Sequence, residues 1–233
     1  MSEAKKQWKL SVMISGSGTN LQSLIDTFPN DERSGKPARV VLVISDNSDA
    51  YGLERAKRAK IKTAVIHPRQ FQSREEFGSA HLKLFREAKI DLVILAGYLK
   101  LVPENVIREY RNRMINIHPA LLPMFGGKGM YGARVHEAVI ESGTKLSGAT
   151  VHFVDEKYDH GPILLQYPVR VYYSDTPPVL AKRILKYEHK LLPLAVHLIS
   201  TGRVEVRGRR VYIDGEENIN WADSYFSELE RNY

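Results

Sequence analysis

Two polar side chains interrupt an otherwise apolar segment, Met114–Pro123 (MINIHPALLP), and their types suit acyl transfer to an amine. Residues two apart on a strand face the same side, so Asn116 and His118 are expected to project together from the end of a buried strand. An amide N–H can stabilise a developing oxyanion, while an imidazole can take up and return protons. Taken alone, the segment is more typical of a hydrogen-bonded structural histidine than of a catalytic one.

A second polar cluster strengthens the catalytic interpretation. The segment 150–162 (TVHFVDEKYDHGP) places Thr150 and His152 on one face of a strand and follows them with a turn that contains several carboxylates. A carboxylate from this turn that reached His118 would hold the imidazole in place and raise its pKa from about 6.5 towards working pH. The alternative is that the acidic residues of the turn are solvated loop charges.

A glycine-rich turn, residues 15–20 (SGSGTN), follows the first apolar run of the chain. Such a turn lets the amides at the start of the next helix point outward, where the helix dipole favours an anion such as a phosphate. It lacks the lysine of a Walker loop and the third glycine of the dinucleotide fingerprint. From this motif alone, a phosphate site and a tight turn in which Thr19 or Asn20 caps the helix are equally supported.

The composition points to a single folded domain. With 233 residues, 43% of them apolar, the chain can bury a core of ordinary size. The longest apolar run, Leu92–Leu99, is far shorter than the roughly 20 residues of a membrane helix. Too few apolar residues precede Gly16 for a signal peptide, whose core needs roughly 7 or more. We therefore expect a cytoplasmic protein that contacts no membrane.

Charge and cysteine content narrow the chemistry. The chain has no cysteine, which excludes disulfides, thiolate nucleophiles and cysteine-based metal sites. Lys and Arg number 34 against 27 Asp and Glu, a net charge of +7 that is dispersed along the chain. This favours small anionic substrates over nucleic acid. No metal is predicted, because no common zinc pattern fits the spacing of the candidate ligands His118, His136, His152 and His160.

Apolar periodicity predicts an alternation of strands and helices in the first half of the chain. Strands are predicted at 10–15, 40–45, 63–66 and 92–96. Helices are predicted after the glycine turn, after Ser48 and Asp49 through Lys60, from 73 to 89, and from 103 onwards. Ser73 and Glu76 form a predicted capping box. Strands at 148–154 and 162–173, a helix at 177–200 and a hairpin at 204–213 follow.

This order predicts an α/β protein. Apolar strands alternating with helices are typical of a doubly wound, mostly parallel sheet, and the later strands are expected to be antiparallel. Ligands in such sheets bind beyond the carboxyl ends of the strands at the topological switch point. The segments 16–20, 96–100 and 116–118 are therefore expected to converge there.

Several motifs together resemble one family. They are ISGSGTNLQ (14–22), SDN (45–47) with GLERA (52–56), LAGY (95–98), NIHPALLP (116–123), and VHFV (151–154) followed by DHGP (159–162). Over nearly its whole length the chain resembles the glycinamide ribonucleotide formyltransferases, which belong to a superfamily of folate-dependent formyltransferases. The resemblance implies a Rossmann-like, phosphate-binding half at about 10–117 and a folate-binding and C-terminal half at about 118–233, within one domain over 1–233.

The resemblance also implies roles for individual residues. Asn116 would hold the formyl oxygen, His118 would shuttle protons, and Asp159 would pair with His118. Thr150 and His152 would support these catalytic groups. The phosphate and ribose of the ribonucleotide would be bound by Gly18, Thr19, Asn20 and Glu188, and the folate by Arg74, Tyr98, Leu99, Lys100, Leu101, Val154 and Asp155.

Two features depart from the common family pattern. Lys100 stands where arginine is frequent, and a lysine keeps the charge but loses the planar fork. The glycine-rich segment 125–132 differs among members, so Lys128 and Tyr131 receive no role, although a mobile loop over the site would suit a lid.

The implied reaction transfers the formyl group of 10-formyltetrahydrofolate to the amine of glycinamide ribonucleotide in purine biosynthesis, without a covalent enzyme intermediate. A related enzyme with another acceptor is disfavoured, because about nine residues precede the first strand and such relatives usually carry an extra domain. A non-catalytic anion-binding or nucleotide-binding module is the other alternative. The protein is expected to act on small molecules as a monomer or homodimer.

Overall fold

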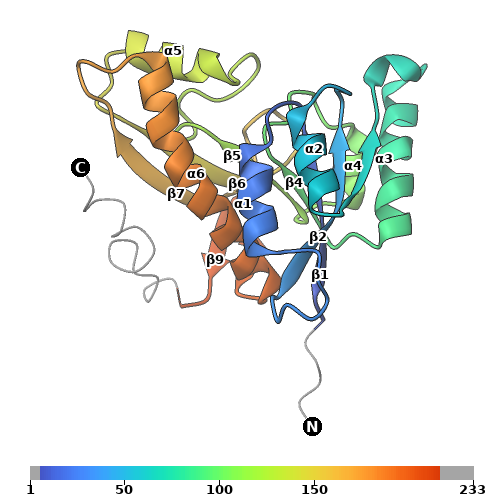
Figure 1. Ribbon diagram of the computed structural model, residues 1–233. Coiled ribbons are helices and arrows are strands. Elements are labelled where there is room, and N and C mark those ends of the chain that lie inside the picture. The colour runs from blue at the N-terminus through green and yellow to red at the C-terminus, as the bar shows by residue number, and fades with distance from the viewer. Residues whose placement is uncertain (1–5, 216–233) are drawn as a thin grey trace.

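A seven-stranded sheet forms the centre of the protein in a computed structural model that describes residues 6–215 (Figure 1). In spatial order the strands are β3 (Lys62–Val65), β2 (Ala38–Ser45), β1 (Trp8–Ile14), β4 (Leu92–Leu95), β5 (Met114–His118), β6 (Leu146–Phe153) and β7 (Ile163–Arg170). Strands β1 to β5 are parallel, and β6 and β7 are antiparallel to their neighbours. The predicted α/β class and its change of strand direction are confirmed.

Helices cover both faces of this sheet, and each face buries its own apolar core. The helices are α1 (Thr19–Thr27), α2 (Tyr51–Arg58), α3 (Arg74–Ala88), α4 (Glu104–Glu109), α5 (Ala133–Glu141) and α6 (Pro177–Ser200), with a 3₁₀ turn η1 at Pro68–Gln70. The first core includes side chains of α1, α2, α5 and α6, and the second includes those of α3 and α4. Because both faces are covered, the parallel strands are apolar on both sides.

The start of α3 shows how local sequence sets a helix boundary. The hydroxyl of Ser73 accepts a hydrogen bond from the amide of Glu76 at 3.1 Å, as an N-cap does. The carboxylate of Glu76 accepts in return from the amide of Gln72 at 3.0 Å. The reciprocal bond of the predicted capping box therefore forms one residue earlier than expected.

The C-terminal half differs from the prediction in two places. Helix α5 (Ala133–Glu141) was not predicted from the sequence. The strand predicted at 162–173 ends at Arg170, because the carboxylate of Asp175 accepts from the amide of Tyr172 at 2.8 Å and pairs with Arg183 at 2.6 Å. These contacts turn the chain away from the sheet and into α6. The predicted hairpin is present as β8 (Val204–Arg207) and β9 (Arg210–Ile213).

The domain prediction extends beyond the described residues. Residues 1–5 and 216–233 lie outside them, so a single domain over 1–233, with halves near 10–117 and 118–233, stays a prediction. Within the described part, α6 packs on α1 of the first half and on β6 of the second, and Figure 1 shows α6 and α1 side by side.

Gly148 on β6 lets the segment after β5 lie directly on the sheet. A Cβ atom at this position would stand 2.1 Å from the carbonyl oxygen of Tyr167 and 2.8 Å from the side chain of Leu121. The side chain of Leu121 occupies the space that any larger residue would need. Gly148 thereby helps to place the loop that follows His118.

Replacing Gly148 by alanine should destabilise the fold by about 1–3 kcal/mol, the usual cost of overpacking a tightly packed site. Equilibrium unfolding in urea measures this loss. Gly16→Ala is the matched control, because nothing lies within 4 Å of its added Cβ. Equal unfolding midpoints for the two variants would contradict the packing argument.

Candidate active site

Antiparallel pairing of β5 with β6 brings the two predicted polar clusters together. In the register, Asn116 lies opposite His152 and His118 lies opposite Thr150. The hydroxyl of Thr150 donates to the carbonyl of Ala120 at 2.6 Å and accepts from the amide of Leu122 at 3.1 Å. It therefore holds the turn that follows His118 against β6.

The carboxylate of Asp159 reaches both histidines of this pair of strands. Its Oδ2 lies 3.7 Å from Nδ1 of His118, and its Oδ1 lies 3.6 Å from Nε2 of His152. The amide nitrogen of Asn116 donates to Oδ1 at 3.4 Å, and the amide of Gly127 donates to Oδ2 at 2.9 Å. The carboxylate expected near His118 is thus present, and the catalytic roles of these residues stay predictions.

His152 sets the orientation of the Asn116 amide. Nδ1 of His152 lies 2.8 Å from the carbonyl oxygen of Phe153, a contact that requires a proton on Nδ1. In the neutral ring Nε2 is then an acceptor, and Nδ2 of Asn116 donates to it at 3.1 Å. One N–H of the Asn116 amide therefore donates to His152. The other N–H makes a longer contact with Asp159 and can donate to a substrate oxygen instead.

The imidazole of His118 is buried, and the prediction that its pKa would be raised is wrong in direction. Burial lowers its pKa below the ordinary value of 6.5, and the charge of Asp159 and the contact with Phe125 offset this only in part. Its Nε2 lies 2.8 Å from the carbonyl oxygen of Phe125 and carries the proton in the neutral ring. Nδ1 is then an unprotonated base that faces Asp159.

Asp159 keeps its negative charge despite its partial burial. Burial alone raises its pKa, but the contacts with His152, His118 and Gly127 outweigh burial, so the net pKa is lowered. Its backbone has a left-handed φ of 51°, which costs free energy in a residue other than glycine. A carboxylate held in a strained backbone beside two imidazoles is the type of arrangement found at functional sites.

The glycine-rich segment 125–132 holds Asp159 in place, a function that the sequence reading missed. A Cβ at Gly126 would lie 2.4 Å from the side chain of Leu122 and 3.2 Å from Cβ of Asp159, so a larger residue here would have to displace these side chains. Gly127 supplies the amide that binds Asp159. The glycines themselves were the available signal, because a run of them marks close approach of the backbone.

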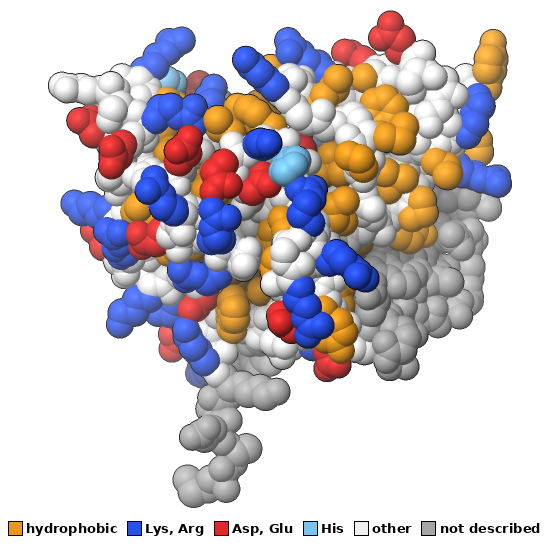
Figure 2. Space-filling view, turned by 180° about the vertical axis from the view of Figure 1, so that it is seen from behind, with side chains coloured by type: hydrophobic (Ala, Val, Ile, Leu, Met, Phe, Trp, Pro, Cys, Tyr) orange, Lys and Arg blue, Asp and Glu red, His pale blue; other side chains and the backbone are white. Residues whose placement is uncertain are grey.

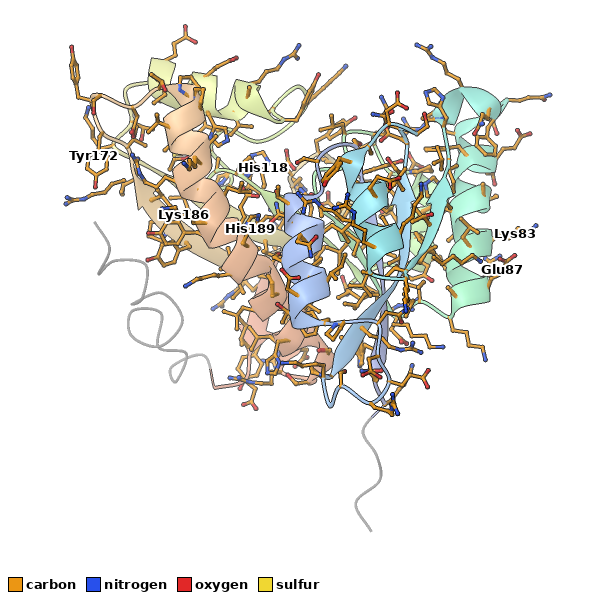
Figure 3. The ribbon with its side chains drawn as sticks, viewed as in Figure 1. Lys83, Glu87, His118, Tyr172, Lys186 and His189 are labelled. Carbon is orange, nitrogen blue, oxygen red and sulfur yellow. The ribbon has the colours of Figure 1, made fainter. Side chains whose placement is uncertain are left out.

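A cavity of about 800 Å³ connects these residues with the glycine turn. Its walls include Asn116, His118 and Asp159, the turn residues 16–20, the segment 127–133 and the first turns of α6. A cavity of this size is typical of small-molecule sites. Figure 3 shows His118 between α6 and α1, with His189 on the part of α6 beside α1.

The glycine turn has the backbone geometry of an anion site. Gly18 is the N-cap of α1 with a left-handed φ of 69°, and α1 has no side-chain cap. A Cβ at Gly18 would lie 2.7 Å from Cα of Gly52, whose amide donates to the carbonyl of Gly16. The alternative in which Thr19 or Asn20 caps the helix is therefore wrong, and α1 begins at the cavity with free amides.

Asn20 and Glu188 join α1 to α6 beside this turn. The side-chain amide of Asn20 donates to Glu188 at 2.6 Å, and both residues are buried and line the cavity. Burial raises the pKa of Glu188, and the bond from Asn20 offsets part of that rise. The predicted ribonucleotide residues are therefore neighbours, and their role in binding stays a prediction.

Comparisons with known proteins agree on one family. The formyl transferase family matches residues 8–196. The chain belongs to the formyl transferase family. It is 41% identical to a chloroplastic phosphoribosylglycinamide formyltransferase of Arabidopsis thaliana over 88% of this chain and 70% of that protein. It is 36% identical to the phosphoribosylglycinamide formyltransferase of Haemophilus influenzae over 89% and 94% of the two chains.

Solved structures of the same family share the fold. The crystal structure of glycinamide ribonucleotide transformylase 1 from Symbiobacterium toebii has a TM-score of 0.82 and 43% sequence identity. The match covers 89% of this chain and 94% of that chain. The family match at residues 8–196 includes both the parallel strands and the segments that hold Asn116, His118 and Asp159.

The predicted folate residues of this formyl transferase lie in different places. Tyr98 and Leu99 line the cavity, whereas the lining does not include Arg74, Lys100, Leu101, Val154 or Asp155. Nζ of Lys100 lies 3.6 Å from Asp46, and Asp155 pairs with His160 at 2.7 Å. Arg74 is exposed at the start of α3. Their contact with a folate stays a prediction.

Further cavity residues, on α5 and on the first turns of α6, were given no role in this site by the sequence analysis. His136 of α5 is buried in the cavity wall, and its Nδ1 has no hydrogen-bond partner in the described chain. Burial, followed by the nearby His118, lowers the pKa of His136 to about 4, so the ring is neutral at pH 7. Lys182 of α6 also lines the cavity. A correct prediction of α5 would have drawn attention to His136.

Across residues 6–215, no group of three or more His, Asp or Glu is arranged to hold a metal ion. No helix within the same range is both long and apolar enough to cross a membrane.

Asp159→Asn should lower the pKa of His118 further. The negative charge favours the protonated imidazole, so its removal should shift the pKa down. An NMR titration of the ring would show this, and the acid limb of kcat/KM would move to lower pH. Asp155→Asn is the control, because Asp155 pairs with His160 instead. An unchanged His118 titration in Asp159→Asn would contradict the assignment.

Proposed function

We propose that this formyl transferase passes the formyl group of 10-formyltetrahydrofolate to the primary amine of glycinamide ribonucleotide, a step of purine biosynthesis. The observation that carries the proposal is one cavity in which the Asn116, His118 and Asp159 cluster lies close to a helix N-terminus with free amides. The names of the Arabidopsis thaliana and Haemophilus influenzae relatives support the same acceptor. The protein is proposed to be cytoplasmic, as a monomer or homodimer, although the Arabidopsis relative is chloroplastic.

The chemistry needs a neutral amine, a stabilised oxyanion and a proton carrier. The lone pair of the substrate amine attacks the formyl carbon, and the carbonyl electrons move to oxygen. The available N–H of Asn116 would donate to this oxygen. The attacking nitrogen then loses a proton, the bond from carbon to N10 breaks, and N10 gains a proton. The substrate amine is itself the nucleophile, so no covalent bond to the protein is required.

His118 is suited to carry that proton. Burial keeps its pKa below 6.5, so the ring is neutral near pH 7 and Nδ1 is an acceptor. Once Nδ1 is protonated, the charge of Asp159 at 3.7 Å stabilises the imidazolium. The carbonyl of Phe125 holds Nε2–H, which fixes the ring orientation throughout. The burial of His118 and the charge of Asp159 together would therefore favour both the release of the proton and its uptake.

The ribonucleotide would be held between α1 and α6. The free amides at the start of α1, next to Gly18 and Thr19, are suited to the phosphate. Glu188, positioned by Asn20, would accept hydrogen bonds from the ribose hydroxyls. On the face seen in Figure 2, Lys and Arg side chains are interspersed with Asp and Glu.

The formyl donor would bind on the other side of Asn116. Tyr98 and Leu99 form cavity wall there, and their apolar surface fits a flat heterocycle. Asp159 also lines the cavity and would help to order the proton path. The other predicted folate residues do not line the cavity, so they would contact only a part of the donor that extends beyond it. They are Arg74, Lys100, Leu101, Val154 and Asp155.

The proposal is tested by mixing the protein with both substrates and following the folate absorbance. Turnover that depends on glycinamide ribonucleotide is the expected result. Turnover with water alone would indicate a deformylase, and turnover with another amine would indicate a different acceptor. Binding of both substrates without any turnover would overturn the proposal in favour of a non-catalytic module.

Asn116→Ala should reduce kcat by about 10²–10³-fold, because loss of one oxyanion donor typically costs about 2.7–4 kcal/mol. Steady-state kinetics with both substrates saturating measures the change. Asn30→Ala, at an exposed position remote from the cavity, is the control. A kcat for Asn116→Ala equal to that of the control would remove Asn116 from the reaction.

A further inference from the structure

We propose that Asp46 is a positioning residue that holds the Tyr98–Lys100 segment in the shape that the formyl donor requires. The inference rests on the proposed function and adds to it a group that lies outside the cavity. Asp46 directly follows β2, is only 6% exposed and does not line the cavity. Asp46 reaches two adjacent residues of the Tyr98–Lys100 segment, which we call the wall segment. It contacts Leu99 through Ser15 and pairs directly with Lys100.

The first contact runs through Ser15, the first residue of the glycine-rich turn at 15–20. The Ser15 hydroxyl donates to Oδ1 of Asp46 at 2.5 Å and accepts from the amide of Leu99 at 2.9 Å. The amide of Ser15 donates to the carbonyl of Gly97 at 3.1 Å. One serine therefore joins the start of the phosphate turn to the wall segment, and Asp46 fixes the direction of its hydroxyl.

The second contact is with Lys100. Nζ of Lys100 lies 3.6 Å from Oδ2 of Asp46, and about half of the lysine side chain is exposed. An ion pair of this kind contributes little stability by itself. Its effect is geometric, because it draws Lys100 towards β2 while Leu99 stays at the cavity.

Tyr98 is the residue between these contacts and the cavity. Its ring is 8% exposed and lines the cavity, and its hydroxyl has no hydrogen-bond partner within the described residues. Burial, and then the charge of Asp46, raise the pKa of Tyr98, so the phenol stays protonated. The carboxylate of Asp46 thus acts on all three residues of the segment. Its charge acts on Tyr98, its bond to Ser15 holds the amide of Leu99, and it pairs directly with Lys100.

These contacts predict which kinetic constant will change. A loosened wall segment must be ordered again when the formyl donor binds, and this cost weakens binding. The reacting groups Asn116 and His118 lie on β5 and touch neither Asp46 nor Ser15 in the described contacts. The KM for the formyl donor should therefore rise while kcat is largely preserved.

The experiment compares Asp46→Ala, Asp46→Asn and Ser15→Ala in the full chain. Asp46→Ala should raise the KM for 10-formyltetrahydrofolate about tenfold, with kcat within about threefold of the unchanged protein. Asp46→Asn keeps an oxygen that can accept from Ser15 and should restore KM to within about threefold. Ser15→Ala removes the bridge to Leu99 and should raise KM about fivefold or more. These fold-changes follow from a wall segment held by one or two hydrogen bonds.

Asp91→Ala is the matched control. Asp91 also flanks the sheet, pairs with Lys6 at 2.5 Å and accepts from the amide of Lys9 at 2.9 Å, but it does not line the cavity. It should lower the melting temperature without changing either KM. If Asp46→Ala and Ser15→Ala behave like this control, Asp46 has only a structural role and the inference is wrong.

Direct titration of the formyl donor by calorimetry, without ribonucleotide, separates this inference from the proposed function. A weaker Kd in Asp46→Ala, restored in Asp46→Asn, is expected. Lack of turnover by the unchanged protein would refute the proposed function alone. Equal Kd values in all variants, or no donor binding by the unchanged protein, would overturn the inference. Should Asp46→Ala fail to fold, the Kd of Ser15→Ala tests the inference in its place, because this variant removes the bridge between Asp46 and Leu99.

Discussion

The rest of the site depends on the placement of one partly buried carboxylate, that of Asp159. It lies within 3.7 Å of His118 and 3.6 Å of His152, and it accepts hydrogen bonds from Asn116 and Gly127. A charge taken out of water is costly unless partners replace the lost hydration. These partners include Asn116 and His118, the residues for which a part in the reaction is proposed. The requirement to satisfy the carboxylate therefore also brings these two residues together.

Burial and charge act in opposite directions on His118, and burial wins. The predicted rise in the pKa of His118 took account only of the nearby carboxylate and not of burial. A neutral imidazole next to a fixed negative charge suits the proposed proton transfer, because the charge stabilises the protonated form once the proton has arrived. In that proposal, burial keeps the ring neutral before proton uptake and the carboxylate stabilises the ring after it.

Two other tethers hold the walls of the cavity. Asn20 and Glu188 join α1 to α6, and Ser15 joins the glycine turn to Leu99. Each tether connects segments that are far apart in the chain. The bond between Asn20 and Glu188 is buried, and the Ser15 hydroxyl is held by a part-buried bond to Asp46. Such contacts are specific because a partner that moves leaves a polar group unsatisfied. The substrates are therefore expected to meet preformed walls.

The sequence alone determined the alternation of strands and helices, the change to antiparallel strands, and the candidates Asn116 and His118. These follow from apolar periodicity and from the two-residue repeat of a strand. The family resemblance was needed to select Asp159 among the carboxylates of its turn. Tertiary structure decided the net pKa of His118, the partner of Lys100, the role of the glycines beside Asp159, and the entry of His136 into the cavity. Burial and pairing depend on which distant segments come into contact, and no local pattern contains that information.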